Sequence, residues 1–400
     1  MTGRPHGRGI RHIDLTAVQP ASSETARRIN RDIVLEIIRE NQPISRADLA
    51  RRSGLQRSTV SQIVEQLIRE KWVREGAQAT AARGRRPTLL GLNEDVLVIA
   101  VDIHPRRATI ATVDLNGHLL AQARATLTRE PQASTQLIVQ AMQRLRGMIP
   151  DKTIEGIGVS LPGRVDPATE QLIFAPNLHW PQFDLKSAIE AAMQLPVWME
   201  NAAKACLLAE LIFGDLDGNR DVVLVTVSEG VGSGVFANGR MVSGHHGMAG
   251  EFGHIILDAS GPRCACGRTG CWEVFASTRA ALRYYHELEP DARVATFAEL
   301  LHLAESGNDH AAQAVEKQAR YIGDGLRIIM AALAPGTILI AGDITSAWHR
   351  YGPVIERAAS KQTLAGSAPR ILPAHDGDLA RLKGAAALVF QRRQIMSEGL

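Results

Sequence analysis

The sequence is poor in cysteine and has no long apolar run. Only 4 of its 400 residues are cysteine, too few for a disulfide scaffold of this size. No stretch of about 18 uncharged apolar residues occurs, which excludes a membrane-spanning helix. The first 26 residues contain arginines but lack the apolar core of a secretory signal. We therefore expect a protein of the reducing cytoplasm that has no membrane partner.

Glycine and proline are used at ordinary frequency, 35 and 18 residues, which excludes collagen-like and low-complexity architectures. Hydrophobic residues make up 45% of the chain and charged residues 22%, a composition typical of a globular protein with a sizeable core. At roughly 100–200 residues per domain, 400 residues predict two or three domains.

The net charge of +3 conceals an asymmetry along the chain. Residues 1–90 contain 17 Lys+Arg and 9 Asp+Glu, a net charge of +8, whereas residues 91–400 contain 28 and 33, a net charge of −5. A basic N-terminal segment followed by a mildly acidic remainder of the chain suggests that the N-terminal segment binds nucleic acid. A solvated basic tail is the alternative that charge alone leaves open.

Residues 27–69 have the pattern of three helices. We interpret residues 1–26, which have no periodic apolar pattern, as a flexible basic arm. A first helix is predicted from Arg27 to about residue 42, because isoleucines recur at helical spacing at positions 29, 33, 37 and 38. Ser45 is the expected N-cap of a second helix, with Asp48 at its third position. Ser53 and Gly54 predict a turn before a third helix.

The third helix has two faces of different chemistry. One is an apolar stripe made of Val60, Ile63, Val64, Leu67 and Ile68. The other bears polar and basic side chains near the start of the helix, namely Arg57, Ser58, Thr59, Ser61 and Gln62. The stripe would hold the helix on its partners, while the polar side chains reach base edges and phosphates. This pattern favours a helix-turn-helix that binds double-stranded DNA.

Two short strands are predicted after the third helix, at residues 72–73 and 89–90. The segment between them is basic and contains Arg83, Arg85 and Arg86. A basic hairpin behind a recognition helix is typical of a winged helix, whose arginines can enter a narrow minor groove. We therefore predict a winged helix-turn-helix over residues 27–92. A three-helix protein-interaction module with a basic loop is the alternative.

From Asp95 onward the pattern is α/β. Strands are predicted at residues 96–101, 108–113, 156–159, 222–227 and 337–341, and helices at residues 133–148, 184–193 and 311–334. A short turn at His104, Pro105 and Arg106 predicts a hairpin between the first two strands. Two α/β lobes with a cleft between them are consistent with this pattern, which does not define the strand order.

Three of the four cysteines form a tight cluster. Cys264, Cys266 and Cys271 have the spacing C-x-C-x4-C, and His254 lies ten residues before the first of them. Three thiolates and an imidazole make a tetrahedral ligand set that suits a structural Zn²⁺, with no open position for catalysis. Free thiols or a redox pair in a surface loop are the alternative. Cys206 lies in an Ala/Leu-rich stretch and is interpreted as buried.

Two segments carry a family resemblance. Residues 247–254 (GMAGEFGH) and residues 264–273 (CACGRTGCWE) resemble the signature of the ROK family of repressors, open reading frames and sugar kinases. The resemblance covers most of residues 95–400, and the helix-turn-helix ahead of it is similar to the repressor branch that contains xylose- and N-acetylglucosamine-type regulators. It implies an actin/hexokinase-like (ribonuclease-H-like) fold and dimers or tetramers. Residues 93–199 with 378–400 would form one lobe, and residues 200–377 the other.

The sequence departs from the family's kinases at two places. The kinases have an Asp-x-Gly-Gly-Thr phosphate loop, whereas here Asp102 and Ile103 are followed by His104, Pro105 and two arginines. Proline lacks the N–H group that such a loop uses for phosphate. The kinases also have Asn-Asp, where the aspartate is the catalytic base, but here Asn201 is followed by Ala202. Since a positioned base contributes about 10²–10⁴-fold, we expect no kinase activity. Residues 230–234 (GVGSG) are only a weak nucleotide signal.

The sugar-contacting positions of the family are better retained. The resemblance places Gly163, Arg164, Asn177, Asn201, Glu251, His254 and Glu273 at such positions. Carboxylates and amides can make paired hydrogen bonds with sugar hydroxyls. His254 would bind zinc through one ring nitrogen and a hydroxyl through the other. Alternatively, Glu251 and Glu273 only brace the zinc loop.

These observations predict a DNA-binding repressor of sugar-metabolism genes, whose degenerate kinase body senses a sugar or sugar derivative. Two alternatives stay open. One is a sugar kinase with an added DNA-binding domain. The other is a regulator controlled by a protein partner, with no sugar ligand.

Overall fold

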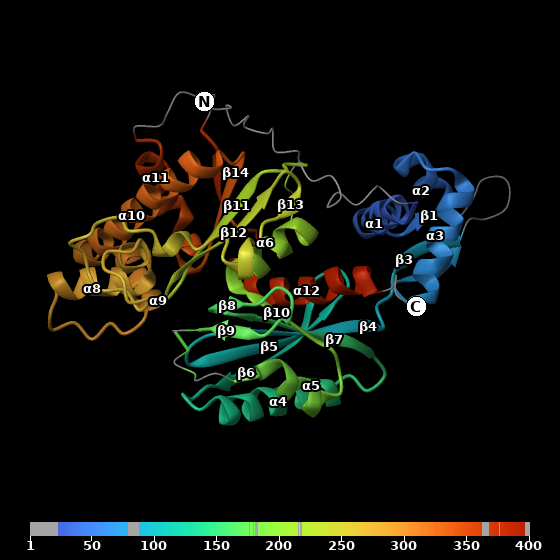
Figure 1. Ribbon diagram of the computed structural model, residues 1–400, viewed down its shortest axis with the longest axis horizontal. Helices are drawn as coiled ribbons and strands as arrows, with labels where there is room; N and C mark the ends of the chain where they lie inside the picture. The colour runs from blue at the N-terminus through green and yellow to red at the C-terminus, as the bar shows by residue number, and fades with distance from the viewer. Residues whose placement is uncertain are drawn as a thin grey trace, which may run out of the picture. The chain divides into compact units, whose positions relative to one another are not determined.

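The computed structural model describes residues 23–78, 88–175, 177–178, 180, 183–214, 216, 218–361, 368–375 and 377–396. The chain divides into two compact units, Met1–Asn93 and Glu94–Leu400. Figure 1 labels their elements. Most of the expected N-terminal arm lies outside the described residues. Residues 23–26 are helical, so the first helix begins four residues before the predicted start at Arg27.

The first unit has three helices and a small sheet. Its elements are α1 (Ser23–Asn41), β1 (Ile44–Ser45), α2 (Arg46–Ser53), α3 (Arg57–Arg69), β2 (Val73–Gln78) and β3 (Thr88–Leu92). The predicted cap is confirmed, because the Ser45 hydroxyl accepts the Asp48 backbone N–H at 3.2 Å. Gly54 ends α2 with φ of +68°, a left-handed conformation that glycine adopts without strain. These features separate α2 from α3 by a short turn.

The buried face of α1 contains only part of the isoleucine pattern that predicted the helix. Ile29 and Ile33 are 51% and 40% exposed, and the buried residues are Val34, Leu35 and Ile38. Arg31 is itself buried, and its guanidinium lies 2.5 Å from the Glu70 carboxylate and 5.8 Å from the Trp72 ring centre. These contacts with the end of α3 turn the helix face that contains Arg31 inward. The predicted helix is therefore confirmed, but of its four spaced isoleucines only Ile38 is buried.

The predicted hairpin after α3 is present. Strands β2 and β3 are antiparallel, and β1 adds a third strand on the other side of β3, in the order β1-β3-β2. A two-residue strand such as β1 has no periodicity from which it could be predicted. The residues that connect β2 to β3, including Arg83, Arg85 and Arg86, lie outside the described residues. The helix-turn-helix with a strand pair is confirmed.

The second unit contains two five-stranded sheets. The first has the order β10-β7-β4-β5-β6 and the second the order β13-β12-β11-β14-β15. The first is built from β4 (Val96–Ile103), β5 (Arg107–Asp114), β6 (Leu119–Thr126), β7 (Thr153–Leu161) and β10 (Val197–Asn201). The second is built from β11 (Val222–Val227), β12 (Val231–Ala237), β13 (Arg240–Met241), β14 (Thr337–Ala341) and β15 (Arg370–Pro373). A two-stranded sheet of β8 (Arg164–Val165) and β9 (Leu172–Phe174) lies beside the first.

Helices cover both faces of each sheet. In the first lobe, α4 (Pro131–Gly147) and α5 (Leu185–Met193) share a core with β4, β7 and β10. In the second lobe, one face packs on α8 (Thr278–Leu288), α9 (Phe297–Glu305), α10 (Asp309–Leu333) and α11 (Trp348–Ala359). Because both faces are covered, every residue of β4, β11 and β14 is buried. The predicted two-lobed α/β body is confirmed.

Two further helices lie between the sheets (Figure 1). Helix α6 (Ala202–Phe213) packs on β11 and β12, and α12 (Ala380–Met396) packs on β4 and β7 as well as on α6. Small residues permit the close approach. A Cβ built on Gly158 of β7 would lie 1.7 Å from the Ala385 carbonyl oxygen, and one on Gly384 would lie 2.5 Å from the Ala205 backbone. The C-terminal helix is therefore seated directly on the first sheet.

Short helical segments complete the second unit. These are η2 (His245–Gly247), η3 (Phe252–His254), α7 (Glu273–Ala276), η4 (Asp343–Ala347) and η5 (Gly377–Leu379). Across the described ranges, no helix combines the length and the apolar character that a membrane span requires.

We expect Gly158→Ala to destabilise the second unit. The added methyl group must push α12 away from β7, and overpacking of this kind costs about 1–3 kcal/mol. The Tm should fall by a few degrees in a thermal melt. Gly147→Ala is the matched control, because no atom lies within 4 Å of its added Cβ. Equal Tm values for the two variants would show that α12 is not tightly seated.

Candidate metal centre and interlobe cavity

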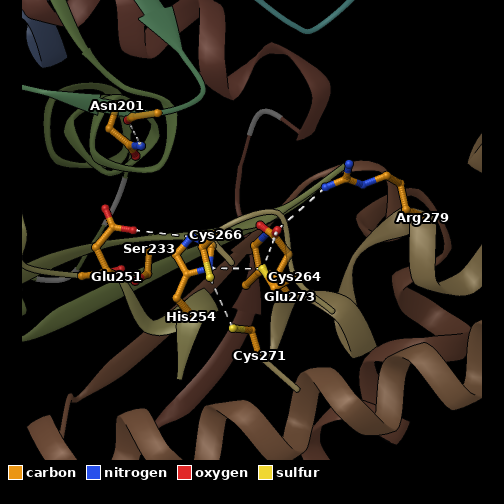
Figure 2. A network of polar contacts seen from close by, with 12 residues as sticks. Asn201, Ser233, Glu251, His254, Cys264, Cys266, Cys271, Glu273 and Arg279 are labelled. Carbon is orange, nitrogen blue, oxygen red and sulfur yellow. Dashed lines mark hydrogen bonds and ion pairs between the residues drawn. The ribbon is translucent and has the colours of Figure 1, made fainter. Parts of the chain in front are cut away.

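The four predicted metal ligands lie together. The ligand atoms of His254, Cys264, Cys266 and Cys271 are all within 4.8 Å of one another. The His254 Nδ1 lies 3.6 Å from the Cys264 Sγ, and the Cys266 and Cys271 sulfur atoms are 3.7 Å apart, too far for a disulfide. Figure 2 shows the four side chains converging on one point.

These distances fit a tetrahedral zinc ion. With Zn–S near 2.3 Å and Zn–N near 2.0–2.1 Å, tetrahedral geometry places two sulfurs about 3.8 Å apart and a sulfur and a nitrogen about 3.6 Å apart. The cluster also has the expected shielding, because Cys264 and Cys271 are buried while Cys266 and His254 are half-buried. The residues present therefore fit a metal ion.

The loop that carries the cysteines is folded by its own backbone. Isolated bridges pair Ile256 with Cys271 and Arg263 with Thr269, and the Cys264 N–H donates to the Arg268 carbonyl at 2.8 Å. Gly270 has φ of +72°, and an added Cβ would lie 1.6 Å from the Asp258 carbonyl oxygen. Only glycine fits here, which explains why the loop can bring Cys271 back beside Cys266.

Glu273 and His254 connect the cluster to its surroundings. The Glu273 carboxylate is buried, accepts the Val231 N–H at 3.1 Å and lies 3.7 Å from the Cys264 Sγ. The second ring nitrogen of His254, Nε2, lies 3.9 Å from the Glu251 carboxylate. His254 thus faces the sulfur atoms with one nitrogen and Glu251 with the other (Figure 2).

A cavity of about 580 Å³ adjoins the cluster, between the two lobes. All seven of the residues predicted to contact a sugar line it, namely Gly163, Arg164, Asn177, Asn201, Glu251, His254 and Glu273. They come from both lobes and from segments more than a hundred residues apart in the chain. The structure therefore brings the predicted set together in one space large enough for a small polar ligand.

Several of these residues are positioned by hydrogen bonds. The Asn201 side chain caps α6 by accepting the Ala203 N–H at 2.9 Å and donates to the Gly163 carbonyl at 2.7 Å. Asn177 of the first lobe accepts from Arg279 of α8 at 3.2 Å, and Arg279 also lies 3.8 Å from Glu273. Arg164 has a buried Nε with no hydrogen-bond partner among the described residues. The cavity wall is thus held from both lobes.

The position of the expected base lies in the same cavity. Ala202 is the first residue of α6 and lines the wall, and it has no group that can accept a proton. Lys204, two residues on, donates to the Gly247 carbonyl at 2.7 Å and is buried. Ala202 therefore offers a ligand in this cavity only a methyl group.

Asp102, at the end of β4, is paired with two side chains inside the protein. Its carboxylate lies 2.7 Å from the Arg381 Nε and 2.8 Å from the His104 Nε2. Burial acts to raise the pKa of Asp102, but the Arg381 charge and the His104 hydrogen bond outweigh it and lower this pKa below its ordinary value. Asp102 is therefore a buried carboxylate whose charge is already compensated.

The predicted DNA-contacting residues of α3 lie on its open side. Arg57, Ser58 and Gln62 are exposed, and Thr59 and Ser61 are half-buried, while the stripe from Val60 to Leu67 is buried. The helix begins at Arg57, so these side chains occupy its first two turns, where a recognition helix contacts bases. The described residues do not include Arg83, Arg85 or Arg86.

Sequence reasoning did not identify four other polar residues near the cavity. Lys204, Arg268 and Arg381 line it, and Arg279 lies behind Asn177 and Glu273. Arg381 is separated from Asp102 by 279 residues, so no local spacing could have connected them. Arg268 lies within the quoted segment 264–273, and Lys204 lies two residues after Ala202, but their side-chain directions depend on the folded chain.

Family comparisons agree with both units. The ROK family model matches residues 98–392, and a MarR family model matches residues 33–84. The xylose repressor of Bacillus subtilis (strain 168) is 29% identical over 376 residues, covering 92% of this chain and 97% of the repressor. The ROK match exceeds half of the chain, and the MarR match coincides with the helix-turn-helix.

Solved structures show the same relation. A ROK family transcriptional regulator described as a homologue of the Escherichia coli MLC protein has a TM-score of 0.77 and 25% identity, covering 93% of this chain and 98% of that one. A ROK glucokinase from Streptomyces griseus, solved with glucose and AMPPNP, has a TM-score of 0.68 and 28% identity, covering 74% of this chain and 99% of the kinase. The regulator therefore matches both units, and the expected actin/hexokinase-like fold is confirmed. This chain belongs to the ROK family, in the branch that carries a helix-turn-helix ahead of the ROK body.

Proposed function

We propose that this protein is a sugar-responsive transcriptional repressor of sugar-metabolism genes. The proposal rests on one observation. All seven residues predicted to contact a sugar line the same cavity, in a chain that also has a helix-turn-helix. The similarity to a xylose repressor over nearly the full length of both chains supports it. We infer that a dimer or tetramer binds a palindromic operator and that the cavity takes a sugar or sugar derivative.

We infer further that the body senses its ligand without phosphorylating it. Ala202 supplies no base, and Pro105 with its bulky neighbours stands where the kinases have a glycine loop for phosphate. The sugar would change DNA affinity only through a difference in its affinity for two conformations of the protein. ATP-dependent phosphorylation of a hexose above background would contradict this part of the proposal.

The sensor proposal predicts a thermal shift. A sugar present at 100 times its Kd adds about 2.7 kcal/mol to the free energy of unfolding, which raises the Tm by a few degrees. Melting should be measured with the metal-loaded protein and a panel of free and phosphorylated sugars. One sugar should raise the Tm of the native protein and have no effect on Glu251→Ala.

Glu316→Ala is the matched control for that experiment, because Glu316 pairs with Arg320 on the surface of α10, away from the cavity. It should keep the full shift. If no sugar in the panel moves the Tm of the native protein, the sensor proposal fails, and a protein partner becomes the better candidate for control.

We propose that the ion held by His254, Cys264, Cys266 and Cys271 is a structural zinc. Three cysteines and a histidine fill all four tetrahedral positions, so the ion would stabilise the loop and hold the His254 ring in place beside Glu251. Bound zinc would supply this structural role and leave no open position for activating water.

Cys266→Ser should remove the zinc. The serine hydroxyl replaces a thiolate, so the site keeps three strong ligands, and both the metal content and the Tm should fall. Elemental analysis of the purified protein measures the metal directly. Cys206→Ala is the matched control, because Cys206 is buried in α6 outside the cluster and its loss should leave the metal in place. Full zinc content in Cys266→Ser would reject this ligand set.

The DNA-binding proposal predicts a loss of one phosphate contact in Arg57→Ala. Binding to a duplex of random sequence should weaken, and the slope of log K against log salt should become shallower by about 1. Arg69→Ala, at the other end of α3, is the control and should keep the native slope. An unchanged slope in Arg57→Ala would exclude Arg57 from the interface.

A further inference from the structure

The cavity of about 580 Å³ is lined by two cations that have no carboxylate partner. It is the larger cavity of the body, and a smaller one of about 170 Å³ shares Arg381 with it. Arg381 is paired with Asp102. By contrast, Arg164 of β8 and Lys204 of α6 form no ion pair with any residue in the described part of the chain. Their charges are therefore available to a ligand of the larger cavity.

Lys204 is a buried cation in an unfavourable place. Its residue is only 6% exposed, and among the described residues its ammonium group donates to one acceptor, the Gly247 carbonyl, at 2.7 Å. An ammonium group has three hydrogens to donate, and burying its charge without a counter-charge is costly. Lys204 also lies in the first turn of α6, where the helix dipole disfavours a cation. An anion beside Lys204 would relieve both effects.

Arg164 has donors without an acceptor. It is half-buried, and its Nε is buried with no hydrogen-bond partner among the described residues. Its backbone is held in place, because Arg164 pairs with Phe174 of β9 and the Gly163 carbonyl accepts the Asn201 side chain at 2.7 Å. A guanidinium group donates in a planar fork that matches the two oxygens of a carboxylate. Arg164 is therefore a fixed donor that a carboxylate would satisfy.

The two cations come from segments that meet at the cavity. A Cβ built on Gly247 would lie 2.8 Å from the Val165 carbonyl oxygen and 3.9 Å from the Lys204 Nζ. The Lys204 ammonium group therefore lies close to the backbone of β8, of which Arg164 is the first residue. The hydrogen bond from Asn201 to the Gly163 carbonyl joins the start of α6 to the same strand.

No carboxylate stands between these segments at the start of α6. The first turn of α6 contains no acidic residue, and Ala202 presents a methyl group where the family's kinases have an aspartate. The carboxylates that line the cavity come from other segments, namely Glu229, Glu251 and Glu273. A ligand carboxylate beside α6 and β8 would thus meet two cations and no like charge from Ala202.

We propose that the ligand of the larger cavity is an acidic monosaccharide, a uronic or aldonic acid whose carboxylate binds Arg164 and Lys204. Its hydroxyl groups would face the carboxylates and amides that line the remaining wall. The inference rests on the proposed sugar-sensing function and names the class of sugar. A singly charged carboxylate suits this cavity better than a phosphate dianion, because three glutamates line the same space and repel a second negative charge.

The test compares acidic sugars with their neutral parents. Calorimetric titration of the full-length, metal-loaded protein uses glucuronate and gluconate beside glucose, and galacturonate and galactonate beside galactose. One acid should bind at least about tenfold more tightly than its parent, because a carboxylate gains charge-assisted hydrogen bonds that a hydroxyl group lacks. If no acid binds more tightly than its neutral parent, the proposal is wrong.

Two variants test the residues. Arg164→Gln and Lys204→Met should each weaken binding of that acid by about tenfold or more and leave any binding of the neutral hexose unchanged. Arg164 has no partner to lose, so Arg164→Gln should melt like the native protein. Lys152→Met is the matched control, because Lys152 pairs with Asp95 outside the cavity, and it should keep the native affinity. Unchanged affinity in Arg164→Gln, or an equal loss in Lys152→Met, would overturn the assignment.

The remaining outcomes separate this inference from the sensor proposal. If a neutral hexose binds more tightly than every acid and loses affinity in Glu251→Ala, the sensor proposal stands and the acidic ligand is excluded. If no sugar of either kind binds, both fail. Glucose 6-phosphate serves as the third probe. Tighter binding of this phosphate than of every acid, with the same loss in Arg164→Gln and Lys204→Met, would overturn the carboxylate in favour of a phosphorylated sugar.

Discussion

The close packing of α12 against β7 and α6 is the constraint on which the rest of the body depends. Gly158 and Gly384 leave no space for a Cβ at the two crossing points, so the C-terminal helix can lie only where both glycines permit. Through α6, the same helix is joined to the second sheet. Helix α12 thus fixes the distance between the two five-stranded sheets, although all of their strands precede it in the sequence. Any motion between the lobes must be accommodated around this pair of helices.

The chemistry of the cleft follows from that placement. Because α12 is fixed on the first sheet, its first turn places the Arg381 side chain at the end of β4. There Arg381 pairs with Asp102, which also contacts His104. A buried ion pair of this kind contributes little net stability, but removing one partner leaves a costly unpaired charge. The carboxylate of Asp102 is therefore held in the interior of the protein by these two contacts.

Local patterns predicted the elements, and the contacts between distant segments decided what those elements do. The Ser45 cap, the Gly54 turn, the β4–β5 hairpin and the zinc-ligand cluster all depend on residues close in sequence, and all were predicted. The isoleucine spacing predicted α1 but not its buried side, since Glu70 and Trp72 decide where Arg31 packs. The ion pair between Asp102 and Arg381 was not predicted at all, because these two residues are far apart in sequence and meet only in the folded chain. For the larger cavity, the family resemblance provided the long-range information that spacing lacks.

The metal cluster and the larger cavity share two residues, His254 and Cys266, and this has a consequence for how each can be studied. His254 faces Cys264 with Nδ1 and Glu251 with Nε2, so a change at His254 disturbs both sites and cannot separate them. Glu251 lies on the cavity side of this ring, and Cys271 contributes its sulfur to the cluster without lining the cavity. If the metal orients the ring for a ligand, loss of Cys271 weakens ligand binding while loss of Glu251 leaves the metal bound. This asymmetry would assign the direction of the coupling, from the metal to the cavity.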